Sequence, residues 1–348
     1  MIKIKIKDPL VGKNKNSFIG FLYMKEYLRE YQIDITDSDD YDYLFIGANE
    51  FYNKGKSLKE SIDHGLENTS KISGDYFMFD GSDSTALIGA YEVFEQSNAL
   101  FLMKNAKLKK RESYKKPSPL NKWFFNTGSD LDIGYDIPED KWKNIKTTGF
   151  NLGYLMSSGQ YRLSTQKLLA PKPSKKEDVC AIYQGIHSEN YEHKARNDHF
   201  YTNHRKGAWN VLADIKQKYR VHTDKLPYNE YVEVLKNSKL AISPYGMGEV
   251  CYRDFELMEF GTAMIKPNMS DIITTPDYYI DEKTYFAVKP DWSNLNEKIE
   301  YLLDNMELVD FVANNAQKRF TELYSPHNFC MHWYNFFSNI NQVVKDET

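Results

Sequence analysis

The chain has 348 residues, a formal net charge of −4 and three cysteines that are far apart. This length exceeds that of a usual single domain and predicts two domains. The charge balance excludes the broad basic surface of a nucleic-acid-binding protein, and the cysteine spacing excludes a zinc site and a disulfide framework, which favours a reducing compartment.

No apolar run approaches the ~18 residues that a membrane span needs, and the first residues alternate Ile and Lys as a strand does, unlike a signal peptide. We therefore expect a cytoplasmic protein. The lysine-rich segment 107–116 could bring it to a membrane face as a peripheral contact.

The first hundred residues alternate predicted strands and helices. Strands are expected at 2–6, 33–36, 43–46, 76–79 and 99–103, and helices at 18–31, 57–66 and 86–95. Such alternation indicates an open parallel sheet covered by helices, as in a Rossmann-like domain.

Asp80 and Asp83 directly follow the strand predicted at 76–79. Loops at the carboxyl ends of parallel strands carry function, so these carboxylates could supply a general base, bind hydroxyls or bind a metal. A plain turn explains the same residues, because Asp, Gly and Ser all favour turns. Asn49 and Glu50, after the strand at 43–46, are expected to face the same cleft.

The second half repeats the alternation after an irregular region at 117–173 and an exposed linker at 171–177. Strands are expected at 178–183, 219–223, 240–243, 263–265 and 285–288, and helices at 208–218, 228–237, 250–260, 295–304, 307–324 and 328–343. The predicted domains are 1–170, 171–325 and a closing helix at 326–348, whose aromatic stripe would pack back across the domains.

Basic residues are expected where a helix begins in this half. Arg205 and Lys206 directly precede the helix predicted at 208–218, where the helix dipole disfavours cations unless an anion compensates. An ordinary surface pair is the alternative. His187, after the strand at 178–183, is a further candidate site residue, although a lone histidine is often structural.

The stretch 240–267 reads as a strand, a loop with Tyr245, Gly246 and Gly248, a helix, and a second strand. Backbone N–H groups of such a loop and the following helix start favour an anion such as phosphate. Arg253 and Glu256 share one face of the helix, so a guanidinium could hold a diphosphate and a carboxylate could accept ribose hydroxyls. A surface ion pair is the alternative.

Segments 233–248, 252–256 and 261–265 resemble the donor-site block of exostosin-like (family 47-like) transferases, and two Rossmann-like halves with a cleft between them resemble the GT-B glycosyltransferases. The resemblance implies sugar transfer from a nucleoside-diphosphate sugar, with UDP or GDP as the nucleotide, to a glycan or glycolipid hydroxyl. It implies neither a cofactor nor a metal. Glu249 and Glu256 are seven positions apart, whereas many retaining GT-B enzymes have eight, which favours inversion.

The resemblance also implies roles for the candidate residues. Arg253, with Arg205 or Lys206, would hold the diphosphate, and Glu256 the ribose. The loop of Tyr245, Gly246 and Gly248 would lie against phosphate or sugar. The segment from His222 to Leu226, which includes Thr223, would contact the base of the nucleotide. Asp80 or Asp83 would be the general base, with His187 and Glu249 as alternatives. A two-domain protein that binds a sugar or nucleotide without turnover remains the second hypothesis.

Overall fold

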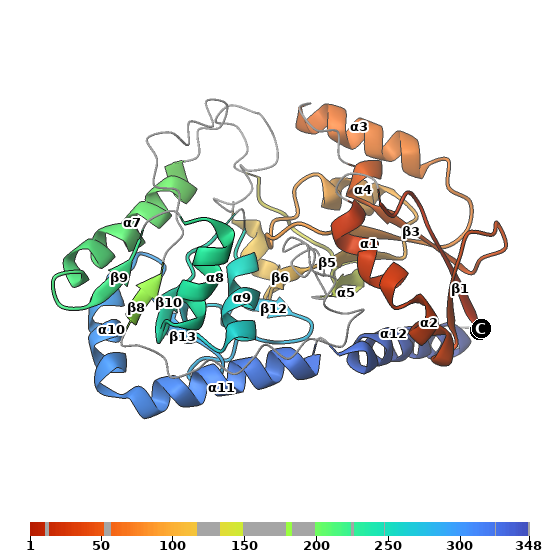
Figure 1. Cartoon of the computed structure of the whole chain (residues 1–348). Coiled ribbons are helices and arrows are strands. Elements are labelled where there is room, and N and C mark those ends of the chain that lie inside the picture. The colour runs from red at the N-terminus through yellow and green to blue at the C-terminus, as the bar shows by residue number, and fades with distance from the viewer. Residues whose placement is uncertain are drawn as a thin grey trace.

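The molecule consists of two α/β halves that lie side by side, each built on a parallel sheet (Figure 1). The computed structural model describes residues 1–10, 14–51, 57–116, 133–148, 179–182, 199–223, 226–246, 248–323 and 325–346. The α/β fold class with two Rossmann-like parallel sheets is therefore confirmed.

The N-terminal sheet has six parallel strands in the order β2-β1-β3-β4-β5-β7. They are β1 (Ile2–Ile6), β2 (Ile33–Thr36), β3 (Tyr43–Gly47), β4 (Tyr76–Asp80), β5 (Phe101–Lys104) and β7 (Ile145–Thr147). β3 and β4 are buried along their whole length, whereas β2 alternates buried and half-buried residues. This difference follows from position, because helices cover both faces of the sheet centre.

Helices of the N-terminal half are α1 (Asn14–Tyr23), α2 (Lys25–Glu30), α3 (Leu58–Thr69), α4 (Ala90–Gln96) and α5 (Glu139–Asn144), with 3-10 turns η1 (Ala48–Glu50) and η2 (Arg111–Lys115). α3 begins with a capping box, in which Ser57 accepts from the Glu60 amide and Glu60 accepts from the Ser57 amide. This reciprocal pair satisfies two backbone donors at the helix start.

The C-terminal sheet has five parallel strands in the order β13-β11-β10-β8-β9. They are β8 (Val179–Ile182), β9 (Arg220–His222), β10 (Leu240–Ile242), β11 (Ala263–Pro267) and β13 (Phe286–Val288), joined by helices α7 (His199–Ile215), α8 (Tyr228–Lys236), α9 (Tyr252–Phe260), α10 (Leu295–Asp304) and α11 (Met306–Leu323). Gly261 ends α9 in the left-handed conformation, with φ of 62°, which glycine adopts without strain.

The two halves are joined by a small sheet and by the last helix. β6 (Ala106–Leu108) pairs antiparallel with β12 (Ile272–Thr274), and the hydroxyls of Thr147 and Thr275 are 2.6 Å apart. α11 runs along the base of the view in Figure 1, and α12 (Pro326–Asp346) continues beneath the N-terminal half beside α2. There Trp333 packs its ring against Phe21 and Phe45, so the aromatic stripe belongs to the core.

Several element boundaries differ from the sequence predictions. The helix predicted at 18–31 is two helices, α1 and α2, and the helix predicted at 86–95 begins only at Ala90. The region 117–173 was predicted to be irregular, yet its described part contains α5 and β7. The linker at 171–177 and the boundary at 170 lie outside the described residues.

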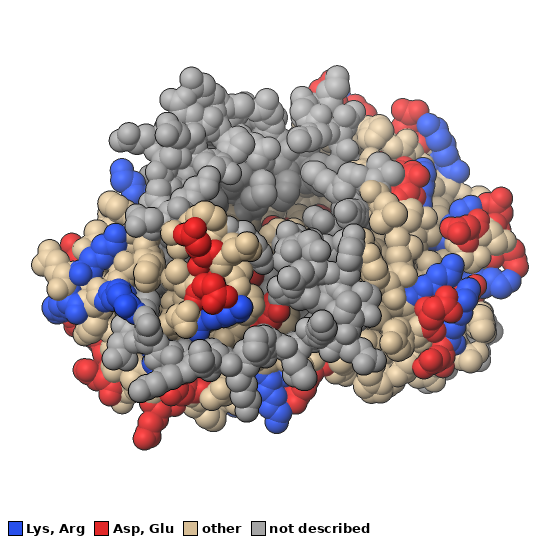
Figure 2. All heavy atoms as spheres, in the orientation of Figure 1, with Lys and Arg blue, Asp and Glu red and all other residues tan. Residues whose placement is uncertain are grey.

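Charges of both signs intermix on the face shown in Figure 2. Within the lysine-rich segment 107–116, the Lys107 ammonium donates to the Ile145 carbonyl at 2.7 Å and lies 3.9 Å from the centre of the Trp142 ring. Lys115 forms an ion pair with Asp136. Membrane contact through this segment stays a prediction. Within the described ranges, no helix is long and apolar enough to cross a membrane.

Candidate active site

The loop between β10 and α9, residues 243–251, occupies the position where parallel sheets bind ligands. It follows the carboxyl end of β10, whose neighbours in the sheet are β8 and β11. Connections leave β8 and β10 toward opposite edges of this sheet, and the crevice beyond such a reversal is the usual ligand site. The Gly246 amide donates to the Gly248 carbonyl at 2.9 Å, which folds the loop back on itself.

Asp254, in the first turn of α9, holds both ends of this loop. Its side chain is fully buried. One carboxylate oxygen accepts from the Ser243 hydroxyl at 2.5 Å, and the other accepts from the Cys251 amide at 3.0 Å and the Tyr279 hydroxyl at 2.5 Å. The buried ammonium of Lys266, on β11, lies 3.1 Å from the same carboxylate. Both ends of the loop are thus fixed to one buried ion pair.

Arg253 and Glu256 converge on the hydroxyl of Tyr231, which belongs to α8. The Tyr231 hydroxyl donates to Glu256 at 2.8 Å and hydrogen-bonds to Arg253. Burial, and then the charge of Glu256, raises the pKa of Tyr231 well above its ordinary value. Arg253 and Glu256 are both half-buried. The predicted pair is therefore one preorganised polar unit at the start of α9.

α7 begins at His199, so the expected helix start at 208 is wrong and Arg205 and Lys206 lie within the helix. Macrodipole compensation at a helix start therefore does not apply to them. Arg205 nevertheless reaches the loop, because its Nε donates to the Tyr245 carbonyl at 3.0 Å. Lys206 is exposed.

His204 also holds Tyr245 of the β10–α9 loop in place. Its ring stacks on the Tyr245 ring at 4.9 Å and contacts the Trp292 ring at 4.7 Å. Its Nε2 accepts from the Tyr245 amide at 3.3 Å, and its carbonyl accepts from the Trp292 indole at 2.7 Å. Burial, and then the nearby Lys266 charge, lowers the pKa of His204 to about 4, so the ring is neutral near pH 7.

Two remaining candidates of this half, His222 and Thr223, lie at the carboxyl end of β9, where Thr223 is buried and His222 half-buried. His187 lies outside the described residues. A role of His222 and Thr223 at the nucleotide base stays a prediction.

Asp80 is part of a buried ion pair in the N-terminal half. Lys104, which is also buried, lies 2.6 Å from one Asp80 oxygen and donates to the Ala86 carbonyl at 2.7 Å. The other Asp80 oxygen accepts from the Ser82 amide at 3.1 Å. These contacts fix the loop that follows β4 (residues 81–86).

Asp83, three residues later, lies beside the acidic residues of the other half. Burial, and then the charges of Asp254, Asp80 and Glu249, raise the pKa of its carboxyl to about 7. The Asp83 carbonyl accepts from the Val250 amide at 3.1 Å. The 81–86 loop and the β10–α9 loop are therefore in direct contact.

Gly248 and Glu249 make the rest of this contact. A Cβ at Gly248 would lie 2.1 Å from the Asp83 carbonyl oxygen, so only glycine fits there. Glu249 is buried, and its carboxylate accepts from the Thr85 amide at 2.9 Å and from the Thr85 hydroxyl at 2.6 Å. Burial raises the pKa of Glu249.

Glu50 lies at the carboxyl end of β3, as expected, and forms an ion pair with Lys7 at 2.7 Å. Lys7 directly follows β1, so this pair marks the position where connections leave β1 and β3 toward opposite edges of the N-terminal sheet. In the described ranges, no group of three or more metal-ligating side chains is positioned to hold a metal ion.

Sequence reasoning missed Tyr231, His204, Asp254, Lys266 and Thr85. Asp254 and Lys266 left a signal: an acid at the third position of a helix often caps it, and a lysine ending a buried apolar strand requires a partner. Tyr231, His204 and Thr85 left none, because their partners are distant in the sequence.

No protein-family model and no curated protein sequence matches this chain. HepE of Anabaena in complex with UDP has a similar backbone at 11% identity and a TM-score of 0.49, with 97% of this chain and 100% of that chain covered. Sucrose-phosphate synthase of Thermosynechococcus elongatus is similar at 12% identity and a TM-score of 0.48, with 99% and 100% covered. A glycosyltransferase of Rickettsia africae is similar at 15% identity and a TM-score of 0.45, with 97% and 98% covered. At these scores the likeness is one of backbone course only, and the exostosin-like assignment stays a prediction.

Proposed function

We propose that the chain is a GT-B-type glycosyltransferase that moves a sugar from a nucleoside-diphosphate sugar to a hydroxyl of a glycan or glycolipid, with inversion and without a metal ion. The observation that carries the proposal is the unit of Arg253, Tyr231 and Glu256 beside the β10–α9 loop, with Asp83 of the other half in contact with that loop. Group transfer needs a bound donor and a general base that lie close together. The contact between the proposed donor loop and Asp83 supports the proposal for that reason.

The donor would lie along the β10–α9 loop. Arg253 would bind the diphosphate through two N–H groups, and Arg205, which already holds the Tyr245 carbonyl, would add a second positive charge. Both guanidiniums would stabilise the negative charge that develops on the leaving diphosphate. Glu256 would accept hydroxyls of the ribose, with its orientation fixed by Tyr231.

Asp83 is the better of the two carboxylates proposed as general base. Asp80 is committed to Lys104 and the Ser82 amide. Asp83, with a pKa of about 7, is poised to take a proton near neutral pH. In the proposed step the acceptor oxygen bonds to the anomeric carbon, the bond from that carbon to the diphosphate breaks, and the hydroxyl proton passes to Asp83.

Nucleotide binding tests the donor site. Titration calorimetry with UDP and GDP should show binding of one of them, and Arg253→Ala should weaken it roughly 10- to 100-fold, as expected for hydrogen bonds to a charged group. Arg319→Ala is the matched control, because Arg319 is a half-buried helical arginine whose Nε donates to the Asp277 carbonyl of the same half. Wild-type protein that binds neither nucleotide would rule out the donor site.

Turnover separates the enzyme from a binding protein. Asp83→Asn should lower kcat by about 10²–10⁴-fold and leave nucleotide affinity unchanged. In the wild type, kcat/KM should rise with pH and level off above about 7, because Asp83 must be ionised to act. Asp80→Asn should instead lower the melting temperature, since it breaks the buried pair with Lys104. Nucleotide binding with no transfer or donor hydrolysis would favour the non-catalytic alternative.

A further inference from the structure

Glu249 makes a polar contact that crosses between the two halves. It belongs to the β10–α9 loop, yet both oxygens of its carboxylate accept from Thr85 of the N-terminal half, at 2.9 Å from the amide and 2.6 Å from the hydroxyl. Glu249 is 5% exposed and Thr85 is 1% exposed, so water does not compete for these bonds. Hydrogen bonds to a buried charge are among the stronger ones in proteins.

The residues beside Glu249 and Thr85 also contact each other across the two halves. Val250, next to Glu249, donates its amide to the Asp83 carbonyl at 3.1 Å, and Gly248 leaves no space for a side chain against that carbonyl. Asp83 therefore sits between two cross-half bonds, one made by its own carbonyl and one made two residues later by Thr85. Its backbone cannot move relative to the β10–α9 loop while both bonds persist.

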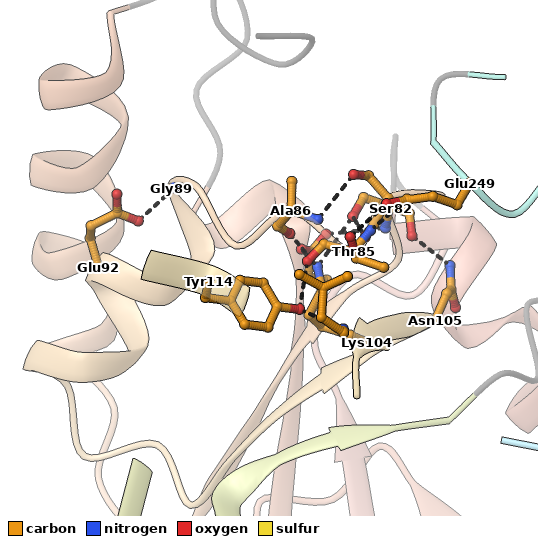
Figure 3. Close-up of polar contacts among 12 residues, drawn as sticks. Ser82, Thr85, Ala86, Gly89, Glu92, Lys104, Asn105, Tyr114 and Glu249 are labelled. Atoms are coloured by element: carbon orange, nitrogen blue, oxygen red, sulfur yellow. Dashed lines mark hydrogen bonds and ion pairs between the residues drawn. The ribbon is translucent and has the colours of Figure 1, made fainter. Parts of the chain in front are cut away.

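Thr85, on the N-terminal side of this contact, is held in place by further hydrogen bonds. The Thr85 carbonyl accepts from the Tyr114 hydroxyl at 2.9 Å (Figure 3). That hydroxyl in turn accepts from the Leu108 amide at 2.9 Å. Leu108 belongs to β6 and pairs with Ile272 of β12, which is the second cross-half contact. A chain of hydrogen bonds thus runs from Glu249 through Thr85 and Tyr114 to the strand pair that joins the halves.

We infer that Glu249 is a positioning residue, which acts through Thr85 to hold Asp83 in register with the β10–α9 loop. This inference rests on the proposed function, in which that loop binds the donor and Asp83 is the base. Glu249 has no contact with the acceptor proton in this role. Its effect should appear in the reacting geometry, because small misplacements of reacting groups reduce turnover more than they reduce binding.

Removal of the Thr85 hydroxyl tests the role of Glu249 in turnover. Thr85→Val keeps the shape and the amide but removes the 2.6 Å bond, and should lower kcat about tenfold or more while the dissociation constant of the nucleotide stays within about threefold. Thr85→Ser keeps the donor and should restore kcat to near the wild-type value. Thr69→Val is the matched control, because Thr69 is a buried threonine of the same half whose hydroxyl donates within α3 to Gly65. Equal loss of kcat in the valine and serine variants, or no loss in either, would overturn the inference.

Hydrogen exchange at single amides measures, without any substrate, how firmly the β10–α9 loop is held against Asp83. The Val250 amide should exchange about tenfold faster in Thr85→Val and in Glu249→Gln than in the wild type, and should be unaffected in Thr69→Val. Unchanged exchange at Val250 in both variants would show that Glu249 does not set the register. Wild-type protein without nucleotide binding would instead refute the proposed function, so the two failures are distinguishable.

Discussion

Replacement of Asp254 by asparagine should destabilise the C-terminal half more than any change on its surface. Four donors converge on the Asp254 carboxylate: the hydroxyls of Ser243 and Tyr279, the Cys251 amide and the Lys266 ammonium. An asparagine side chain offers one oxygen acceptor and brings an NH2 group that is itself a donor. It cannot satisfy all four, and Lys266, which is fully buried, loses its counter-charge.

The expected cost of Asp254→Asn is about 3–5 kcal/mol, the usual effect of removing one partner from a buried ion pair. That is a large part of the ~5–15 kcal/mol by which a domain is stable. A second substitution, Lys266→Met, should recover part of the loss, because the buried charge is then gone and a similar volume remains. The coupling energy of this double-mutant cycle reports the pair directly.

Urea unfolding followed by fluorescence and circular dichroism measures these differences at constant m-value. Glu300→Gln is the control, because Glu300 forms a comparably short pair with Lys218, at 2.6 Å, on the exposed surface, where an ion pair contributes at most ~1 kcal/mol. An Asp254→Asn variant that unfolds within 1 kcal/mol of the wild type would refute the view of Asp254 as the anchor of the β10–α9 loop.

Two further outcomes follow from single contacts. The contribution of His204 to stability should fall as the pH is lowered from about 6.5 to about 4, because the unfolded chain binds a proton at His204 in that window and the folded chain does not; the difference in melting temperature between the wild type and His204→Gln should therefore shrink over that window. Gly248→Ala should destabilise the protein by about 1–3 kcal/mol in urea unfolding, because its Cβ would lie 2.1 Å from the Asp83 carbonyl oxygen; a variant as stable as the wild type would mean that the two loops separate at no cost.

The sheet architecture was predictable because the central strands carry their own signal. β3 and β4 are short apolar runs that end in turn residues, and such runs mark strands buried on both faces. β6 and β12 were missed because they are three residues each and are stabilised by each other, about 165 positions apart in the chain. Pairing between distant short segments leaves no local pattern to detect.

The proximity of two candidate site residues was predictable, because one motif contains both. Arg253 and Glu256 lie on one helix face, so their proximity follows from helical spacing alone. The contact between Thr85 and Glu249 depends on how two separately folded halves meet, which neither local sequence specifies. The same reason explains why Asp80 and Asp83 were equivalent in the sequence. Only the tertiary structure pairs Asp80 with Lys104 and brings Asp83 beside the acidic residues of the other half.

The charges around Asp83 impose a requirement on the donor site. Three carboxylates already disfavour ionisation of Asp83, and an uncompensated diphosphate nearby would disfavour it further. A donor with two or more negative charges could then leave the base protonated at the pH where it must act. Arg253 and Arg205 would counter this effect, because their positive charges would neutralise the diphosphate. In the proposed enzyme the two arginines thus have a double function: they bind the leaving group, and they keep the general base ionised while the donor is bound.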